Sequence, residues 1–276
     1  MMAGTTAQTP EPGLAGGIGD ALTAEWWKLR SVRSTYWVLG ATAATLGFVL
    51  LLAIQMAHVW DGLSAERRED LGLRPLQELA GWGAGLSLAV LGVLAITPEY
   101  RTGLIRQTFA ALPRRRTVLA AKAAVIGAVA LVAGEVVMIG SFLGTRLIVG
   151  DRRFPDQDAS VAHELPGLAI SGTSVAMFAL LGLTLGVLLR STAGALVSVV
   201  FLWHVLPMLA FQLPDPWSER IGSVLPGALA PQAAGRGADN SIYGDLLPPG
   251  AAAAMMAAYA FVPLGLAAVA LARRDA

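Results

Sequence analysis

Six apolar runs of about twenty residues dominate the pattern of this chain, and polar loops separate them. An α-helix rises about 1.5 Å per residue, so each run can cross a hydrocarbon core of about 30 Å. Backbone groups in that core must bond within their own segment, which favours helices. The pattern therefore predicts an all-α, polytopic membrane protein whose transmembrane domain covers 36–271. The predicted spans are 36–57, 79–97, 123–143, 168–189, 194–213 and 251–271.

Composition agrees with this class, and the distribution of charge predicts an orientation. The 276 residues are 55% hydrophobic and 14% charged, with a mean hydropathy of +0.61. Of the 20 Lys and Arg residues, 12 lie in the termini and in the second and fourth loops, whereas 13 of the 19 acidic residues lie in the other three loops. Because positive loops stay in the cytoplasm, both termini are expected there, including a short tail at 272–276. Arg outnumbers Lys 18 to 2, a bias typical of GC-rich genomes, so a bacterial plasma membrane is expected.

The region before the first span divides into a tail and a short helix. Residues 1–19 are rich in Gly, Pro, Ala and Thr, and disorder is expected for them. At 20–35, apolar side chains recur at helical spacing beside basic ones, which predicts an elbow helix in the cytoplasmic interface. This helix could be a functional element or only an anchor. Its candidate residues are Leu22, Glu25, Trp26, Lys28, Leu29 and Arg30.

The second loop carries the most informative polar segment. Leu104, Ile105, Phe109 and Leu112 fall on one helical face, and Pro113 ends the helix. A carboxylate, a guanidinium and a glycine precede this face, which is more than a simple anchor needs. The alternative is a connector on the lipid headgroups, with the arginines at 114–116 acting as a topology signal. The candidate docking residues are Glu99, Tyr100, Arg101, Thr102, Gly103, Leu104, Ile105, Phe109 and Leu112.

The fifth loop, 214–250, is the longest of the three expected outside. Trp217, Ile221, Val224 and Leu225 repeat at helical spacing before Pro226. This spacing predicts a short helix that dips into the outer interface, where protein or a water-filled cavity must cover irregular backbone. The third loop, 146–167, is long and polar, and its role is left open.

Catalytic chemistry is not indicated by the sequence. A phosphate-binding loop needs a Gly-Lys pair, but the two lysines, Lys28 and Lys122, follow Trp and Ala. The histidines have no metal-ligand spacing, and no paired catalytic carboxylates stand on the polar loops. We therefore expect no enzyme activity, no cofactor or metal bound by this chain, and no nucleic-acid partner. Glu135 lies inside a span, with His204 as a titratable residue at similar depth, so the two are a possible intramembrane polar site. The alternative for Glu135 is a protonated packing residue.

Three short motifs resemble a known family. The segments EWWKLRS at 25–31, RSTYW at 33–37 and EYRTG at 99–103, together with six spans, resemble the type-2 ABC transporter permeases of actinobacteria. The resemblance implies the membrane subunit of an exporter, with ATP and Mg bound by a separate ABC ATPase subunit and a second permease copy completing the assembly. The segment 99–112 would then match the coupling helix that docks on the ATPase. Residues 214–250 would match the outer re-entrant region.

Two other classes of function stay open from the residues themselves. An ATP-independent secondary transporter or channel would need Glu135 for coupling, whereas a non-transporting membrane scaffold would need neither Glu135 nor an ATPase. Small-molecule, lipid and peptide substrates are all compatible with apolar spans.

Overall fold

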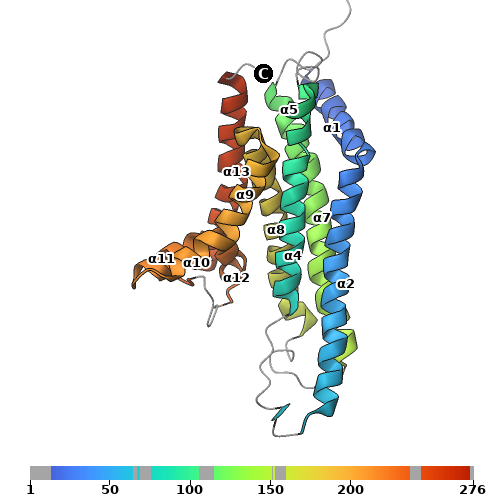
Figure 1. Ribbon diagram of the computed structural model, residues 1–276, viewed down its shortest axis with the longest axis vertical. Coiled ribbons are helices and arrows are strands. Elements are labelled where there is room, and N and C mark those ends of the chain that lie inside the picture. The colour runs from blue at the N-terminus through green and yellow to red at the C-terminus, as the bar shows by residue number, and fades with distance from the viewer. Residues whose placement is uncertain are drawn as a thin grey trace, which may run out of the picture.

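The computed structural model describes residues 14–64, 67–68, 76–105, 115–150, 152, 160–236 and 244–273. Every regular element in these ranges is helical (Figure 1). The main helices are α1 (Leu14–Ser31), α2 (Arg33–Gly62), α4 (Leu76–Leu94), α5 (Thr97–Thr102), α7 (Arg115–Val149), α8 (Val161–Leu189), α9 (Thr192–Val200), α10 (Leu206–Phe211), α11 (Trp217–Val224), α12 (Leu229–Ala233) and α13 (Pro249–Arg273). A π-helical turn, η1 (Phe201–Val205), joins α9 to α10, and a 3-10 turn, η2 (Pro226–Ala228), precedes α12.

Six helical segments of the described chain are long and apolar enough to span a membrane, which confirms the prediction of an all-α chain with six apolar helices of that length. They are α2, the continuous stretch Leu76–Thr102, α7, α8, the stretch Thr192–Phe211 and α13. Successive segments run in opposite directions. The start of α1, α5, the start of α7 and the end of α13 therefore share one end of the molecule, here named the terminal end (top of Figure 1).

The helices are longer than their apolar runs. At 35 residues, α7 measures about 52 Å, well over the hydrocarbon thickness of about 30 Å, and α2 has 30 residues. Both helices therefore continue into the polar region away from the terminal end. There the guanidinium of Arg152 donates two hydrogen bonds to the Asp61 carboxylate, at 2.9 and 2.7 Å.

The N-terminal helix also begins earlier than expected. The structure places 14–19 in α1, so the tail expected to be disordered through residue 19 is helical over its last six positions. Residues 1–13 and 274–276 lie outside the described residues. A single extended residue, Val32 (φ −96°, ψ 124°), separates α1 from α2. The Tyr36 hydroxyl donates to the Arg30 carbonyl across this break, at 2.9 Å.

The centre of the bundle is a close contact between α4 and α8. A Cβ placed on Gly92 would overlap the Ala179 carbonyl, and one placed on Gly182 would overlap the Ala89 carbonyl. The two backbones can approach this closely only because both positions are glycine. Since lipid offers no hydrophobic drive for helices to associate, such close packing is a main source of bundle stability.

The path from α10 to α13 leaves the bundle and returns. After η1, α10 and α11 turn away from the bundle axis and extend sideways (Figure 1). The predicted short helix is present as α11, with Leu225 just after its end. The buried Gln232 on α12 holds the return path together: its amide donates to the Ser223 and Ala228 carbonyls, both at 2.9 Å, and accepts from Leu247 N at 2.8 Å.

Candidate functional site

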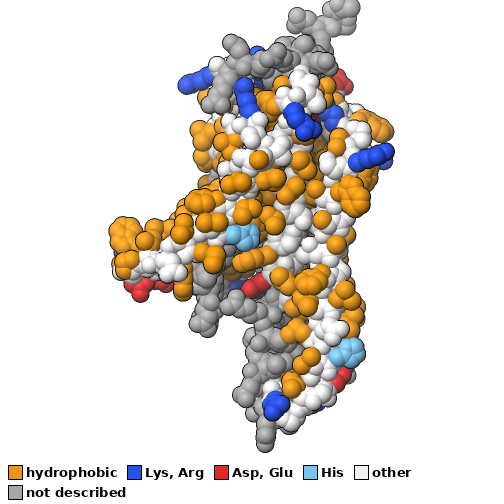
Figure 2. Space-filling model, viewed as in Figure 1, with side chains coloured by type: hydrophobic (Ala, Val, Ile, Leu, Met, Phe, Trp, Pro, Cys, Tyr) orange, Lys and Arg blue, Asp and Glu red, His pale blue; other side chains and the backbone are white. Residues whose placement is uncertain are grey.

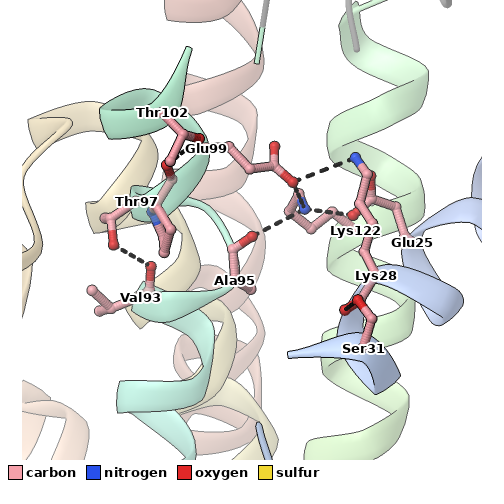
Figure 3. A network of polar contacts seen from close by, with 10 residues as sticks. Glu25, Lys28, Ser31, Val93, Ala95, Thr97, Glu99, Thr102 and Lys122 are labelled. Atoms are coloured by element: carbon pink, nitrogen blue, oxygen red, sulfur yellow. Dashed lines mark hydrogen bonds and ion pairs between the residues drawn. The ribbon is translucent and has the colours of Figure 1, made fainter. Parts of the chain in front are cut away.

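Four charged side chains from three helices meet at the terminal end. Glu25 and Lys28 come from α1, Glu99 from α5 and Lys122 from α7 (Figure 3). We call these four residues the charge cluster. On α1 the spacing of three places Glu25 and Lys28 on one helical face, and they pair at 2.8 Å. The other contacts are tertiary, because they join segments 23 to 97 residues apart.

Lys122 is the centre of the cluster. Its side chain is only 4% exposed, and its ammonium group donates to Glu25 Oε2, to Glu99 Oε1 at 2.9 Å and to the Ala95 carbonyl at 3.0 Å. An ammonium group has three N–H donors, so all of them are used. Lys122 therefore connects α1, α5 and the carbonyl end of α4 through one atom.

Lys28 closes the cluster from the solvent side. Its ammonium group lies 2.8 Å from Glu25 Oε1 and 3.4 Å from Glu99 Oε1. Burial lowers the pKa of Lys28, but the hydrogen bond to Glu25 and the charges of both glutamates outweigh this effect and raise its pKa overall. Lys28 therefore stays charged at neutral pH.

The four charges cancel, which makes their burial possible. Glu25, Glu99 and Lys122 are each at least nine-tenths buried. A buried charge is strongly unfavourable unless it is paired and hydrogen-bonded. One acceptor is left over, since Glu99 Oε2 has no hydrogen-bond partner within the described chain. The remaining bonds of the cluster still join three helices in a low-dielectric site, which favours one arrangement of those helices.

A second set of contacts joins α5 to the turn between α8 and α9. The Thr192 hydroxyl donates to Thr97 Oγ1 at 2.8 Å, and Thr97 in turn donates to the Val93 carbonyl at 3.0 Å. The Arg190 guanidinium lies 5.3 Å from the centre of the Tyr100 ring. As a result, α5 is attached to α1, to α7 and to the turn between α8 and α9.

The predicted docking residues divide into a buried and an exposed group. Glu99 and Ile105 were expected to face a partner, and the structure corrects both. Glu99 is occupied by the two lysines, and Ile105 is 4% exposed because it packs with Val118, Leu119 and Leu271. Arg101, Thr102 and Leu104 are exposed, and Gly103 ends α5 in the left-handed conformation (φ 72°). Phe109 and Leu112 lie outside the described residues.

The predicted elbow residues divide in the same way. Leu29 is buried and Leu22 is half-buried against the bundle, whereas Trp26 and Arg30 point outwards. Helix α1 therefore has an inner face that carries Glu25 and Leu29 and an outer face that is aromatic and basic.

The intramembrane pair expected from the sequence does not meet. The Glu135 carboxyl lies over Gly172 of α8, where a Cβ would overlap it. The His204 ring instead contacts the Trp82 ring edge-on, with centroids 5.4 Å apart. No hydrogen bond or ion pair joins Glu135 to His204 in the part of the chain that the structure describes.

Sequence reasoning missed Lys122, which it took only as one more positive charge near a span. One signal was present: the chain has two lysines among 20 basic residues, and both belong to the charge cluster. The lysine side chain is a compact charge on a flexible stem, which suits a site where one atom must reach three acceptors.

Comparison with protein-family models found no match, and comparison with curated proteins found none either.

Proposed function

We propose that this chain is the membrane-spanning permease subunit of an ABC exporter in a bacterial plasma membrane. A separate ABC ATPase subunit would bind ATP and Mg, and a second permease copy would complete the translocation path. The excess of Lys and Arg at the terminal end supports placing that end, with both termini, in the cytoplasm.

The observation that carries this proposal is the attachment of α5. A permease without its own nucleotide site must receive work from a partner through its cytoplasmic segments. A segment that receives such work has to be connected stiffly to the spanning helices. The charge cluster and the Thr97–Thr192 contact give α5 this connection to α1, α7 and the α8–α9 turn.

The docking surface would begin where the buried contacts end. Arg101 and Leu104 are exposed directly beside the buried Glu99 and Ile105. The sequence continues this surface to Phe109, and a buried aromatic anchor is a common source of binding energy in such interfaces. The rim charge of Arg101 would contribute mainly to orientation and specificity.

Co-purification tests the proposal. The affinity-tagged chain, extracted from its native membrane in mild detergent, is expected to carry an ATP-hydrolysing partner. Glu99→Gln should weaken the charge cluster and lower the amount of that partner, whereas Asp61→Asn, which breaks the ion pair at the opposite end, should not. A wild-type chain that purifies without any ATPase would refute the proposal.

One observation favours a second candidate, an ATP-independent secondary transporter. Glu135 lies within α7 and has no ion-pair partner among the described residues. Ionisable groups inside spans often mark ion or substrate paths. Flux driven by an ion gradient through the purified chain alone, abolished by Glu135→Gln, would favour this candidate.

A further inference from the structure

The outer face of α1 and the start of α2 form an aromatic and basic surface that the proposed function does not use. Four large side chains on it are well exposed: Trp26 (43%), Trp27 (62%), Tyr36 (59%) and Trp37 (79%). We call these four residues with Arg30 the elbow surface. Trp and Tyr favour the zone where lipid headgroups meet the acyl chains.

The elbow surface holds one guanidinium in a defined place. The Arg30 Cζ atom lies 5.8 Å from the Trp26 ring centre and 5.5 Å from that of Trp27, within cation–π range. The Tyr36 hydroxyl fixes the Arg30 backbone from the next helix. The Arg30 side chain is exposed, and no acceptor in the described chain takes a hydrogen bond from it, so its N–H donors are available to a ligand.

The acidic side chains near the elbow surface are mostly buried. Glu25, on the same helix, points inwards to Lys122, and Glu99 is likewise buried. The charges left exposed at the terminal end are basic apart from Asp20; in the described residues they are Arg30, Arg33, Arg101, Arg116, Arg190 and Arg273. Figure 2 shows Lys and Arg side chains gathered at this end on the face in view.

We propose that the elbow surface binds the phosphate group of an anionic phospholipid in the cytoplasmic leaflet. Guanidinium groups bind phosphate through two parallel hydrogen bonds, and the flanking indole rings suit the upper acyl chain. Arg33, exposed at the start of α2 and three residues after Arg30 in sequence, adds a second positive charge to this part of the chain. We infer a lipid because the aromatic rings offer an apolar surface. The acyl chain of a lipid would cover that surface, whereas a free phosphate ion would leave it exposed to water.

The test measures which lipids stay with the full chain. Purified protein is placed in nanodiscs of mixed phosphatidylglycerol and phosphatidylcholine and released from them in a native mass spectrometer. The ratio of phosphatidylglycerol to phosphatidylcholine that stays bound to the protein is then measured. The wild-type chain should enrich phosphatidylglycerol, and Arg30→Gln with Arg33→Gln should reduce this enrichment by about fivefold per arginine removed. Trp27→Leu, which keeps apolar bulk but removes one ring, should give a smaller loss.

The matched control lies at the other side of the molecule. Arg220 is exposed on α11 and its guanidinium lies 5.9 Å from the Trp217 ring, so it repeats the arginine-over-tryptophan geometry without the second arginine. Arg220→Gln should leave the enrichment unchanged. Equal losses in both variants, or unchanged enrichment in the Arg30/Arg33 variant, would overturn the proposal. Displacement of the lipid by millimolar glycerol phosphate would overturn it too, because that result indicates a site for soluble phosphate.

Discussion

Replacing Lys122 by Met should destabilise this protein more than removing any exposed ion pair. The substitution keeps the apolar stem but removes the ammonium group that binds Glu25, Glu99 and the Ala95 carbonyl. Removing one partner of a buried pair typically costs about 3–5 kcal/mol, because an uncompensated charge stays behind. Lys28 still contacts both glutamates in the variant, so we expect about 3 kcal/mol, the lower end of that range.

The assay is the free energy of unfolding in detergent micelles, from a denaturant titration followed by circular dichroism. Arg152→Met is the control, since it breaks an exposed ion pair with Asp61 at the opposite end and exposed pairs contribute little. Adding Glu25→Gln and Glu99→Gln to Lys122→Met should recover part of the loss, because the uncompensated charges are then gone. A Lys122→Met variant no less stable than Arg152→Met would refute the reasoning about the charge cluster.

Three further predictions use the same preparation or intact cells. A reporter fused after Ala276 should be cytoplasmic and one inserted near Asp156 should be outside; both on one side would contradict the six-span topology. Glu135→Gln should unfold at the same or a higher temperature than wild type, since removing an ionisable group that has no ion-pair partner in the described chain is often neutral or stabilising, and a marked loss of stability would contradict this. The pKa of Lys28 is raised above 10.5 in the folded protein. Its contribution to the free energy of unfolding is therefore complete below pH 10.5 and is lost as pH rises through the pKa of the folded state. Melting temperatures of wild type and Lys28→Met should therefore converge at high pH, and a constant difference would contradict this sign.

The spans could be predicted from the sequence because hydropathy directly reflects the membrane solvent. Their ends could not, since α7 continues through Arg115 and Arg146, residues that a search for apolar runs excludes. The helix continues there because its backbone hydrogen bonds can form equally well where polar side chains face water. Helix α11 was predictable from the spacing of Trp217 and Ile221, as it is a local amphipathic element.

The charge cluster was not predictable because its contacts are tertiary. Nothing local to Lys122 indicates that α1 packs against α7 and places Glu25 beside it, 97 residues away in sequence. Ile105 was misjudged for the same reason, because its contacts are also tertiary. Its apolar side chain suggested a partner surface but packs between α7 and α13. An amphipathic pattern indicates that a face is covered and leaves open which surface covers it.

The most direct test of the proposed function is cross-linking from Arg101. The chain has no cysteine, so Arg101→Cys supplies a unique thiol on the exposed surface beside the charge cluster. In native membranes, a thiol-reactive cross-linker at this position should join the chain to an ABC ATPase, identified by mass spectrometry, while Arg220→Cys at α11 should not. Labelling of Arg101→Cys by a membrane-impermeant reagent added outside intact cells, with no ATPase adduct, would contradict the account.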